Sequence, residues 1–106
     1  MNDLPKPPQT YEEFTRRFPG LKEAWDAIGQ AGDRGPLDPK TRRLVKLAVA
    51  IGAQREGAAH SSVRKGLARG VTREEMEQVV ALAAGTVGLP AAVAAFTWIR
   101  DILDKD

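Results

Sequence analysis

Residues 37–51, LDPKTRRLVKLAVAI, decide how this chain is expected to fold. Asp38 is typical of a helix N-cap, and Pro39 suits the first helical turn because its missing N–H needs no partner there. From Leu44 to Ala53 only Lys46 is charged, so the predicted helix is apolar almost all round. Such a helix lies at the centre of a bundle, where other helices or other subunits bury it.

The sequence after this stretch marks the ends of further helices. One helix is predicted over residues 56–68, and Gly70 follows it at the position that favours a left-handed glycine. Thr72 and Glu75 have the spacing of a capping box and open the next helix. Breaks in that helix are predicted at Gly85, Gly88 and Pro90.

The last helix is predicted over residues 91–103, and Trp98 lies at the rim of its apolar stripe. That stripe consists of Ala92, Ala95, Phe96, Ile99, Ile102 and Leu103. No segment shows the alternation of β-branched residues that is typical of a strand. The sequence therefore predicts an all-α orthogonal bundle of five or six helices.

The N-terminal third is expected to begin with an extended arm over residues 1–9, because Pro5, Pro7 and Pro8 disfavour a helix there. Thr10 and Glu13 predict a capping box for a short helix that ends near Phe18. A second helix is predicted over residues 21–30, with Leu21, Trp25 and Ile28 on one face. The 106 residues suit one core, so residues 10–106 are predicted to form a single domain.

Composition excludes several classes of function. The chain has no cysteine, which rules out thiol redox catalysis, disulfides, iron–sulfur clusters and cysteine zinc sites. Sixteen Lys and Arg against fourteen Asp and Glu give a net charge of +2, too small to indicate nucleic acid or an anionic membrane. No apolar run approaches the roughly 18 residues of a membrane span, and residues 1–8 do not resemble a signal peptide. A cytoplasmic location is expected.

Two stretches together resemble a known family. Residues 37–51 and residues 62–75, SVRKGLARGVTREE, are similar in order and spacing to segments of the carboxymuconolactone decarboxylase family. This superfamily includes alkylhydroperoxidase D, and the resemblance runs from about residue 14 to residue 96. It implies an alkylhydroperoxidase D-like helical fold whose subunits assemble into trimers or hexamers. We therefore expect a homo-oligomer.

The chain departs from the chemistry of the peroxidase branch of that family. That branch uses a Cys-x-x-Cys pair, a histidine four residues later and a glutamate on the preceding helix. Counted back from the glycine at residue 70, these positions fall on Arg55, Ala58, Ser62 and Arg43. Peroxide reduction needs a thiolate and a resolving thiol, so the resemblance does not extend to peroxiredoxin-type activity.

The decarboxylase branch lacks the cysteine pair and keeps the histidine, but this histidine position also falls on Ser62. His60 lies two residues away, about 200° around a helix, and therefore points to the opposite side. A direct replacement requires the helix to begin later than residue 56. In the simpler interpretation, the small Ser62 side chain fills the space of the family's histidine.

His60 is the only histidine and the candidate general acid/base. It also stands in a helical row with Glu56 and Arg64, four residues before and after it, which is typical of a solvated surface. Three chains around a symmetry axis could combine His60 with Glu56 into a metal site. Within one chain the sequence predicts no metal site and no cofactor.

Three arginines, Arg43, Arg55 and Arg64, are candidates to bind a substrate carboxylate, and the alternative is a row of surface charges. Two functions therefore remain open. One is cofactor-free acid/base chemistry, such as decarboxylation of a lactone or keto acid, with Ser62 lining the substrate site. The other is a catalytically degenerate binding or assembly module. Nucleic acid is not an expected partner, because the following basic residues lack aromatic stacking partners and match no recognised binding motif: Arg64, Lys65, Arg69 and Arg73.

Overall fold

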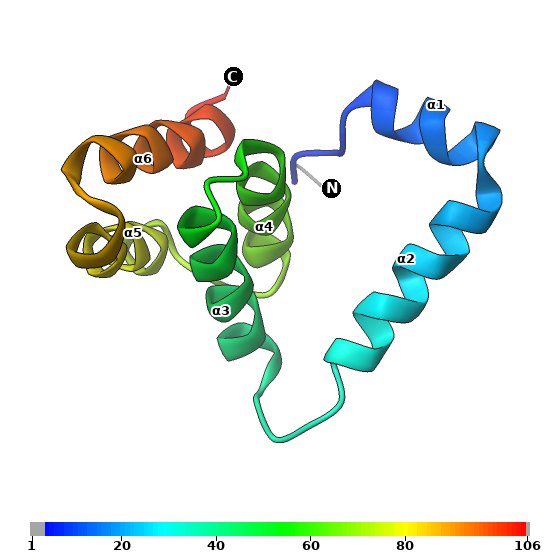
Figure 1. Ribbon diagram of the computed structural model, residues 1–106, viewed down its shortest axis with the longest axis horizontal. Helices are drawn as coiled ribbons and strands as arrows, with labels where there is room; N and C mark the ends of the chain where they lie inside the picture. Colours follow the sequence, from blue (N-terminus) through cyan, green and yellow to red (C-terminus); the bar gives the residue numbers. More distant parts are fainter. Residues whose placement is uncertain (1–3, 106) are drawn as a thin grey trace. The chain divides into compact units, whose positions relative to one another are not determined.

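The structure is a computed structural model that describes residues 4–105. Within that range it contains six helices and no strand, so the predicted all-α class is confirmed. They are α1 (Gln9–Arg17), α2 (Pro19–Gly32), α3 (Pro39–Gly52), α4 (Glu56–Ala68), α5 (Arg73–Val87) and α6 (Leu89–Leu103), shown in Figure 1. None of these helices is both long and apolar enough to cross a membrane.

The described chain divides into two compact units. The four-helix unit comprises residues 38–105 together with residues 4–5, and the two-helix unit comprises residues 6–37. In the four-helix unit α3 packs against α4 and α5, and α6 packs against α4 and α5 (Figure 1). Each helix of this unit therefore contacts two others.

The start of α3 has the predicted cap. The backbone N–H of Thr41 donates to a carboxylate oxygen of Asp38 at 2.8 Å, and Pro39 occupies the first helical turn. Hydrogen bonds from the backbone and the side chain of Thr41 hold the pKa of the Asp38 carboxyl below its usual value, because they stabilise its ionised form. The cap makes α3 begin at one defined residue.

The end of α4 is a Schellman turn. Gly70 has a φ of +81°, which a side chain would disfavour. The N–H of Val71 donates to the carbonyl of Gly66 at 2.9 Å, and the N–H of Gly70 donates to that of Leu67 at 3.2 Å. Gly66 itself is buried, and a Cβ there would come within 3.1 Å of the Met76 side chain. This turn brings the chain back over α4 toward α5.

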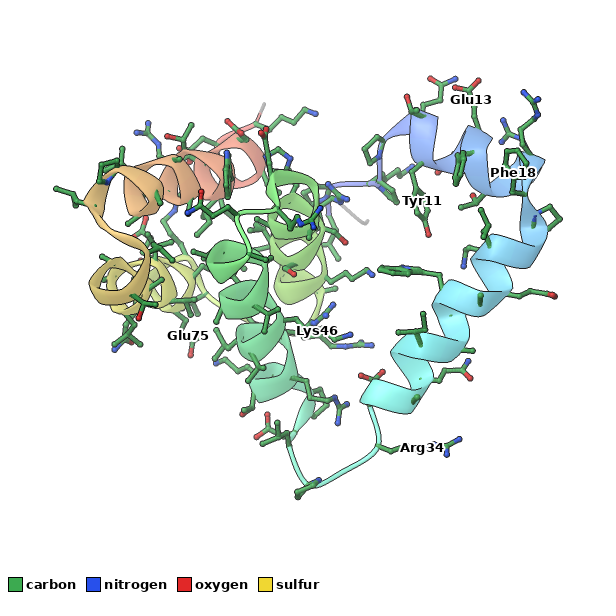
Figure 2. All side chains as sticks on the ribbon, viewed as in Figure 1. Tyr11, Glu13, Phe18, Arg34, Lys46 and Glu75 are labelled. Atoms are coloured by element: carbon green, nitrogen blue, oxygen red, sulfur yellow. The ribbon has the colours of Figure 1, made fainter. Side chains whose placement is uncertain are left out.

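The capping box that opens α5 is confirmed in both directions. The N–H of Glu75 donates to the hydroxyl of Thr72 at 3.1 Å, and the N–H of Thr72 donates to the Glu75 carboxylate at 2.8 Å. Lys40 of α3 also contacts this carboxylate, at 2.8 Å. The hydrogen bond from Lys40, followed by the one from Thr72, holds the pKa of Glu75 below its usual value. Figure 2 labels Glu75.

One prediction about α5 was wrong. The helix does not break at Gly85 but continues to Val87, because a single glycine lowers helical stability without preventing a helix. The break comes at Gly88, whose φ of +92° ends α5, and Pro90 lies in the first turn of α6. The helix therefore ends where the backbone requires a left-handed residue.

One apolar core joins α3 to α6. The predicted stripe of α6 contributes Ala92, Ala95 and Ile99 as buried residues, with Phe96, Ile102 and Leu103 partly buried against them. Trp98, at the rim of the stripe, is partly buried against the same cluster. The remaining buried residues are Leu47, Ala50, Ile51, Ala59, Val63, Val71, Met76 and Val80.

The apolar circumference of α3 is only partly covered. Leu47, Ala50 and Ile51 are buried, as expected for a central helix. Val45 and Val49 are on the other side of α3, and Val49 remains 64% exposed. The helix is thus central to the four-helix unit, while the side that carries Val45 and Val49 is not buried by the other helices of that unit.

The two-helix unit begins differently from the prediction. No side-chain cap is made at Thr10, because α1 begins at Gln9 after an N-cap at Pro8, which places Thr10 inside the first turn. The extended segment is described over residues 4–8, and the rest of the predicted arm, residues 1–3, lies outside the described residues. Phe18 separates α1 from α2, as Figure 2 shows, and its ring lies 5.2 Å from that of Phe14.

We predict opposite effects of alanine at two glycines. Gly70→Ala places a Cβ on a left-handed residue and is expected to lower the free energy of unfolding by about 1–2 kcal/mol. Gly85→Ala adds a good helix former within α5, where no atom lies within 4 Å of its Cβ, and is expected to raise it by up to about 1 kcal/mol. Chemical denaturation of the two variants tests this, and equal effects would contradict the assigned turn.

Candidate functional site

Helix α4 holds the predicted candidates His60 and Ser62 in one continuous helix. It begins at Glu56, and the N–H of Ala59 donates to the carbonyl of Arg55 at 2.9 Å, which closes its first turn. The turn before it depends on Gln54, which has a φ of +57°. A late start of the helix is thereby excluded, so His60 and Ser62 point about 200° apart.

Two carboxylates lie near one nitrogen of the His60 ring. Its Nε2 atom is 3.0 Å from a carboxylate oxygen of Asp101 on α6 and 4.0 Å from one of Glu56 on α4. The His60 side chain is only 22% exposed, whereas those of Glu56 and Asp101 are 60% and 45% exposed. Within residues 4–105, these two carboxylates are the ion-pairing partners of His60.

The contact with Asp101 determines which ring nitrogen remains available. An ionised carboxylate only accepts hydrogen bonds, so Nε2 of His60 must carry the hydrogen that it donates to Asp101. In the neutral imidazole the proton is then on Nε2, and Nδ1 keeps its lone pair. The pair therefore orients the ring and leaves one nitrogen for proton exchange.

Arg64 is the predicted arginine that shares a helix face with His60, four residues along α4. Partial burial of Arg64 lowers the pKa of its guanidinium. Arg43 lies on α3, half-buried, and Arg55 lies in the exposed turn before α4. The helical face that carries His60 thus includes Arg64 but neither Ser62, which is half-buried on the other side, nor Arg55.

Asp101 was not among the predicted residues. It is 41 positions from His60 in the sequence, and its place in the last helix, next to the buried stripe, resembles that of any surface carboxylate. Only the packing of α6 on α4 brings the two residues together. No local spacing in the sequence carries this information.

Comparisons with known proteins agree with this arrangement of helices. The model of the carboxymuconolactone decarboxylase family matches residues 19–101. The chain belongs to the carboxymuconolactone decarboxylase family. This confirms the resemblance noted in the sequence.

Two relatives within the family are informative. The chain is 30% identical over 94 residues to a 4-carboxymuconolactone decarboxylase of Acinetobacter baylyi, and the match covers 89% of this chain. It covers 64% of that enzyme, so this chain spans less than two thirds of its relative's length. It is also similar to the crystal structure of an apo carboxymuconolactone decarboxylase family protein from Legionella pneumophila. That likeness has a TM-score of 0.72 and 25% identity, over 88% of this chain and 87% of the other.

We predict a measurable coupling between His60 and Asp101. In a double-mutant cycle of His60→Ala and Asp101→Ala, the two losses in unfolding free energy should be non-additive by about 0.2–1 kcal/mol, as for partly exposed ion pairs. Thermal denaturation at neutral pH measures this. A control cycle that combines His60→Ala with Glu74→Ala, a change of an exposed residue of α5, should show no coupling. Additive losses for His60 and Asp101 would remove Asp101 from the site.

Proposed function

We propose that this family member performs cofactor-free proton transfer on a small carboxylated substrate, such as a lactone or keto acid that loses carbon dioxide. His60 is the acid/base, and Asp101 orients its ring. The observation that carries the proposal is the 3.0 Å contact between Nε2 of His60 and Asp101, made by a ring that is largely shielded from solvent. The contact supports the proposal because it fixes the orientation of the ring, and a positioned group transfers protons more effectively than a freely rotating one.

The proposed step follows from the chemistry of decarboxylation. The bond between the substrate carbon and its carboxylate breaks, carbon dioxide leaves, and the electron pair remains on the substrate as a carbanion or enolate. The protonated Nδ1 of His60 delivers a proton to that carbon, and the ring takes up another from water. The imidazolium also stabilises the developing negative charge.

Arg64 is the best-placed candidate to bind a second carboxylate of the substrate. It lies one helical turn from His60 and is partly desolvated, which strengthens its attraction for an anion. Arg43 and Arg55 remain candidates from neighbouring elements, and Ser62 remains a candidate for lining the substrate site. The name of the Acinetobacter baylyi relative supports a decarboxylation of this kind.

Thiol peroxidase chemistry is not part of this proposal, because the chain contains no cysteine to form a thiolate. Arg55 and Ala58, at the positions of the family's two cysteines, cannot undergo a reversible two-electron oxidation to a disulfide. A peroxide assay with a dithiol reductant should therefore give only background consumption.

We predict that turnover of a responsive acid depends on His60. In a panel of lactone and keto acids assayed for decarboxylation or tautomerisation, His60→Ala should lower kcat/KM by about 10²- to 10⁴-fold, the usual contribution of a general acid/base. Asp101→Asn should lower it by a smaller factor, because the ring stays but is less well oriented. The exposed carboxylate variant Glu74→Gln is the matched control and should keep its activity. Equal turnover of wild type and His60→Ala would remove His60 from the mechanism.

A second candidate function, assembly of subunits, is favoured by the apolar surface of the two-helix unit. Neither α1 nor α2 contains a buried residue, so this unit has no core of its own. Leu21, Trp25 and Ile28 recur on one face of α2, and Trp25 is 60% exposed. Helices of this length are marginal in water without packing partners. We propose that a second copy of the chain covers this face in a trimer or hexamer.

We predict that charge on this face weakens assembly. Trp25→Glu together with Ile28→Glu should shift the sedimentation coefficient from that of an oligomer toward that of a monomer, because burying two carboxylates in an apolar contact is unfavourable. Glu23→Gln on the same helix is the control and should leave sedimentation unchanged. A wild-type chain that sediments as a monomer at micromolar concentration would contradict the proposal.

A further inference from the structure

We propose that Glu56, His60 and Asp101 form a binding site for a divalent transition-metal ion of the Zn²⁺ class. The proposal goes beyond the proposed function, because cation binding requires neither a substrate nor turnover. It also differs from the symmetric site considered from the sequence, in which three chains combine His60 with Glu56. Here one chain supplies all three side chains.

The distances among the three side chains are close to those of a metal site. One ligand atom from each residue, Nε2 of His60 and a carboxylate oxygen of Glu56 and Asp101, lies within 4.8 Å of the others. In the described contacts Nε2 is 3.0 Å from Asp101 and 4.0 Å from Glu56. Metal–ligand bonds of about 2.0–2.2 Å in a tetrahedral site place ligand atoms about 3.4 Å apart. A small rotation of the exposed carboxylates is enough to reach this geometry.

The donor set indicates the class of ion. One imidazole nitrogen and two carboxylate oxygens are ligands that Zn²⁺, Co²⁺ and Mn²⁺ accept, while the absence of thiolates disfavours soft ions. Mg²⁺ prefers oxygen ligands and retains much of its water, so the imidazole contributes little to its binding. Three protein ligands leave a coordination position for water. The set is therefore typical of an exchangeable transition-metal site.

The charges around the cluster favour a cation. Two carboxylates lie near one ring nitrogen, and Arg100, the residue before Asp101 on α6, is engaged elsewhere. Its Nε atom is 3.0 Å from Asp104, and its guanidinium lies over the ring of Phe96 at 5.8 Å. Arg64 lies a full turn further along α4. A metal ion would relieve the repulsion between the two carboxylates more fully than a single imidazolium can.

The two helices that carry the cluster are anchored in the apolar core. Ala59 and Val63 flank His60 on α4, and Ile99 lies two residues before Asp101 on α6; all three are fully buried in the same core cluster. Glu56 and His60 are four residues apart, which places them on one face of α4. The ligands thus come from two packed helices rather than from loops, which holds them close to a binding geometry.

Metal binding and proton transfer are alternative states of the same ring. A metal ion bound at Nε2 replaces the hydrogen that His60 donates to Asp101, so the orienting contact of the proposed function is lost. Cation binding can therefore be present in a protein that catalyses nothing. Cation binding can also be absent from a protein that is catalytically active. Failure of the metal-binding proposal therefore leaves the proton-transfer proposal standing, and the reverse also holds.

The test is a titration of the untagged, metal-free protein with Zn²⁺. Calorimetry measures the binding, and the NMR signals of the single histidine report on its imidazole ring. We expect one Zn²⁺ per chain and a change in the imidazole signals that saturates at the same ratio. The single variants His60→Ala and Asp101→Asn should each weaken Zn²⁺ binding by more than about tenfold. Mutation of a residue that only supports a metal ligand already lowers metal affinity by about that factor. Circular dichroism confirms that each variant keeps its helices.

Glu74→Gln removes an exposed carboxylate from α5 and should leave Zn²⁺ affinity unchanged. Mg²⁺ is the comparison ion and should leave the imidazole signals in place. Imidazole signals that do not move with Zn²⁺, or equal affinity of wild type and His60→Ala, would overturn the proposal. A stoichiometry of one Zn²⁺ for three chains would overturn it in favour of a symmetric site between subunits.

Discussion

The packing of α4 on α6 is the constraint on which the candidate site depends. Small and branched side chains, Ala59 and Val63 on α4 with Ala95 and Ile99 on α6, are buried in one core and let the two helices approach closely. That approach brings His60 within 3.0 Å of Asp101 although 41 positions separate them. Without this interface His60 is one more charged or polar residue on a helical surface.

The chain keeps the fold of its family although it contains no cysteine. The helix caps and turns that identify the family, at Asp38, Gly70 and Thr72, are all formed. The thiols needed for peroxide reduction are missing, and the one imidazole lies on the opposite side of α4 from Ser62. The fold depends on backbone hydrogen bonds and apolar burial, so it tolerates the loss of reactive side chains.

The proton-transfer and metal-binding proposals rest on one property of the cluster, an imidazole with two carboxylates near its Nε2 atom. Such a ring can exchange a proton at one nitrogen or share its other nitrogen with a cation. Which state is populated depends on metal and proton concentrations rather than on the fold. Assembly is a separate matter, because it concerns apolar residues that neither unit buries in its own core, such as Trp25 of α2 and Val49 of α3.

Local signals were sufficient for most helix boundaries: the Asp38 cap, the left-handed Gly70 and the Thr72–Glu75 box depend on neighbours within a few residues. They failed at Thr10, where Pro8 starts the helix earlier, and at Gly85, where a single glycine is not enough to end the helix. The exclusion of thiol chemistry and the role of His60 as a candidate also came from the residues alone. The partnership with Asp101 did not, because side chains on two distant helices meet only after the core has brought those helices together.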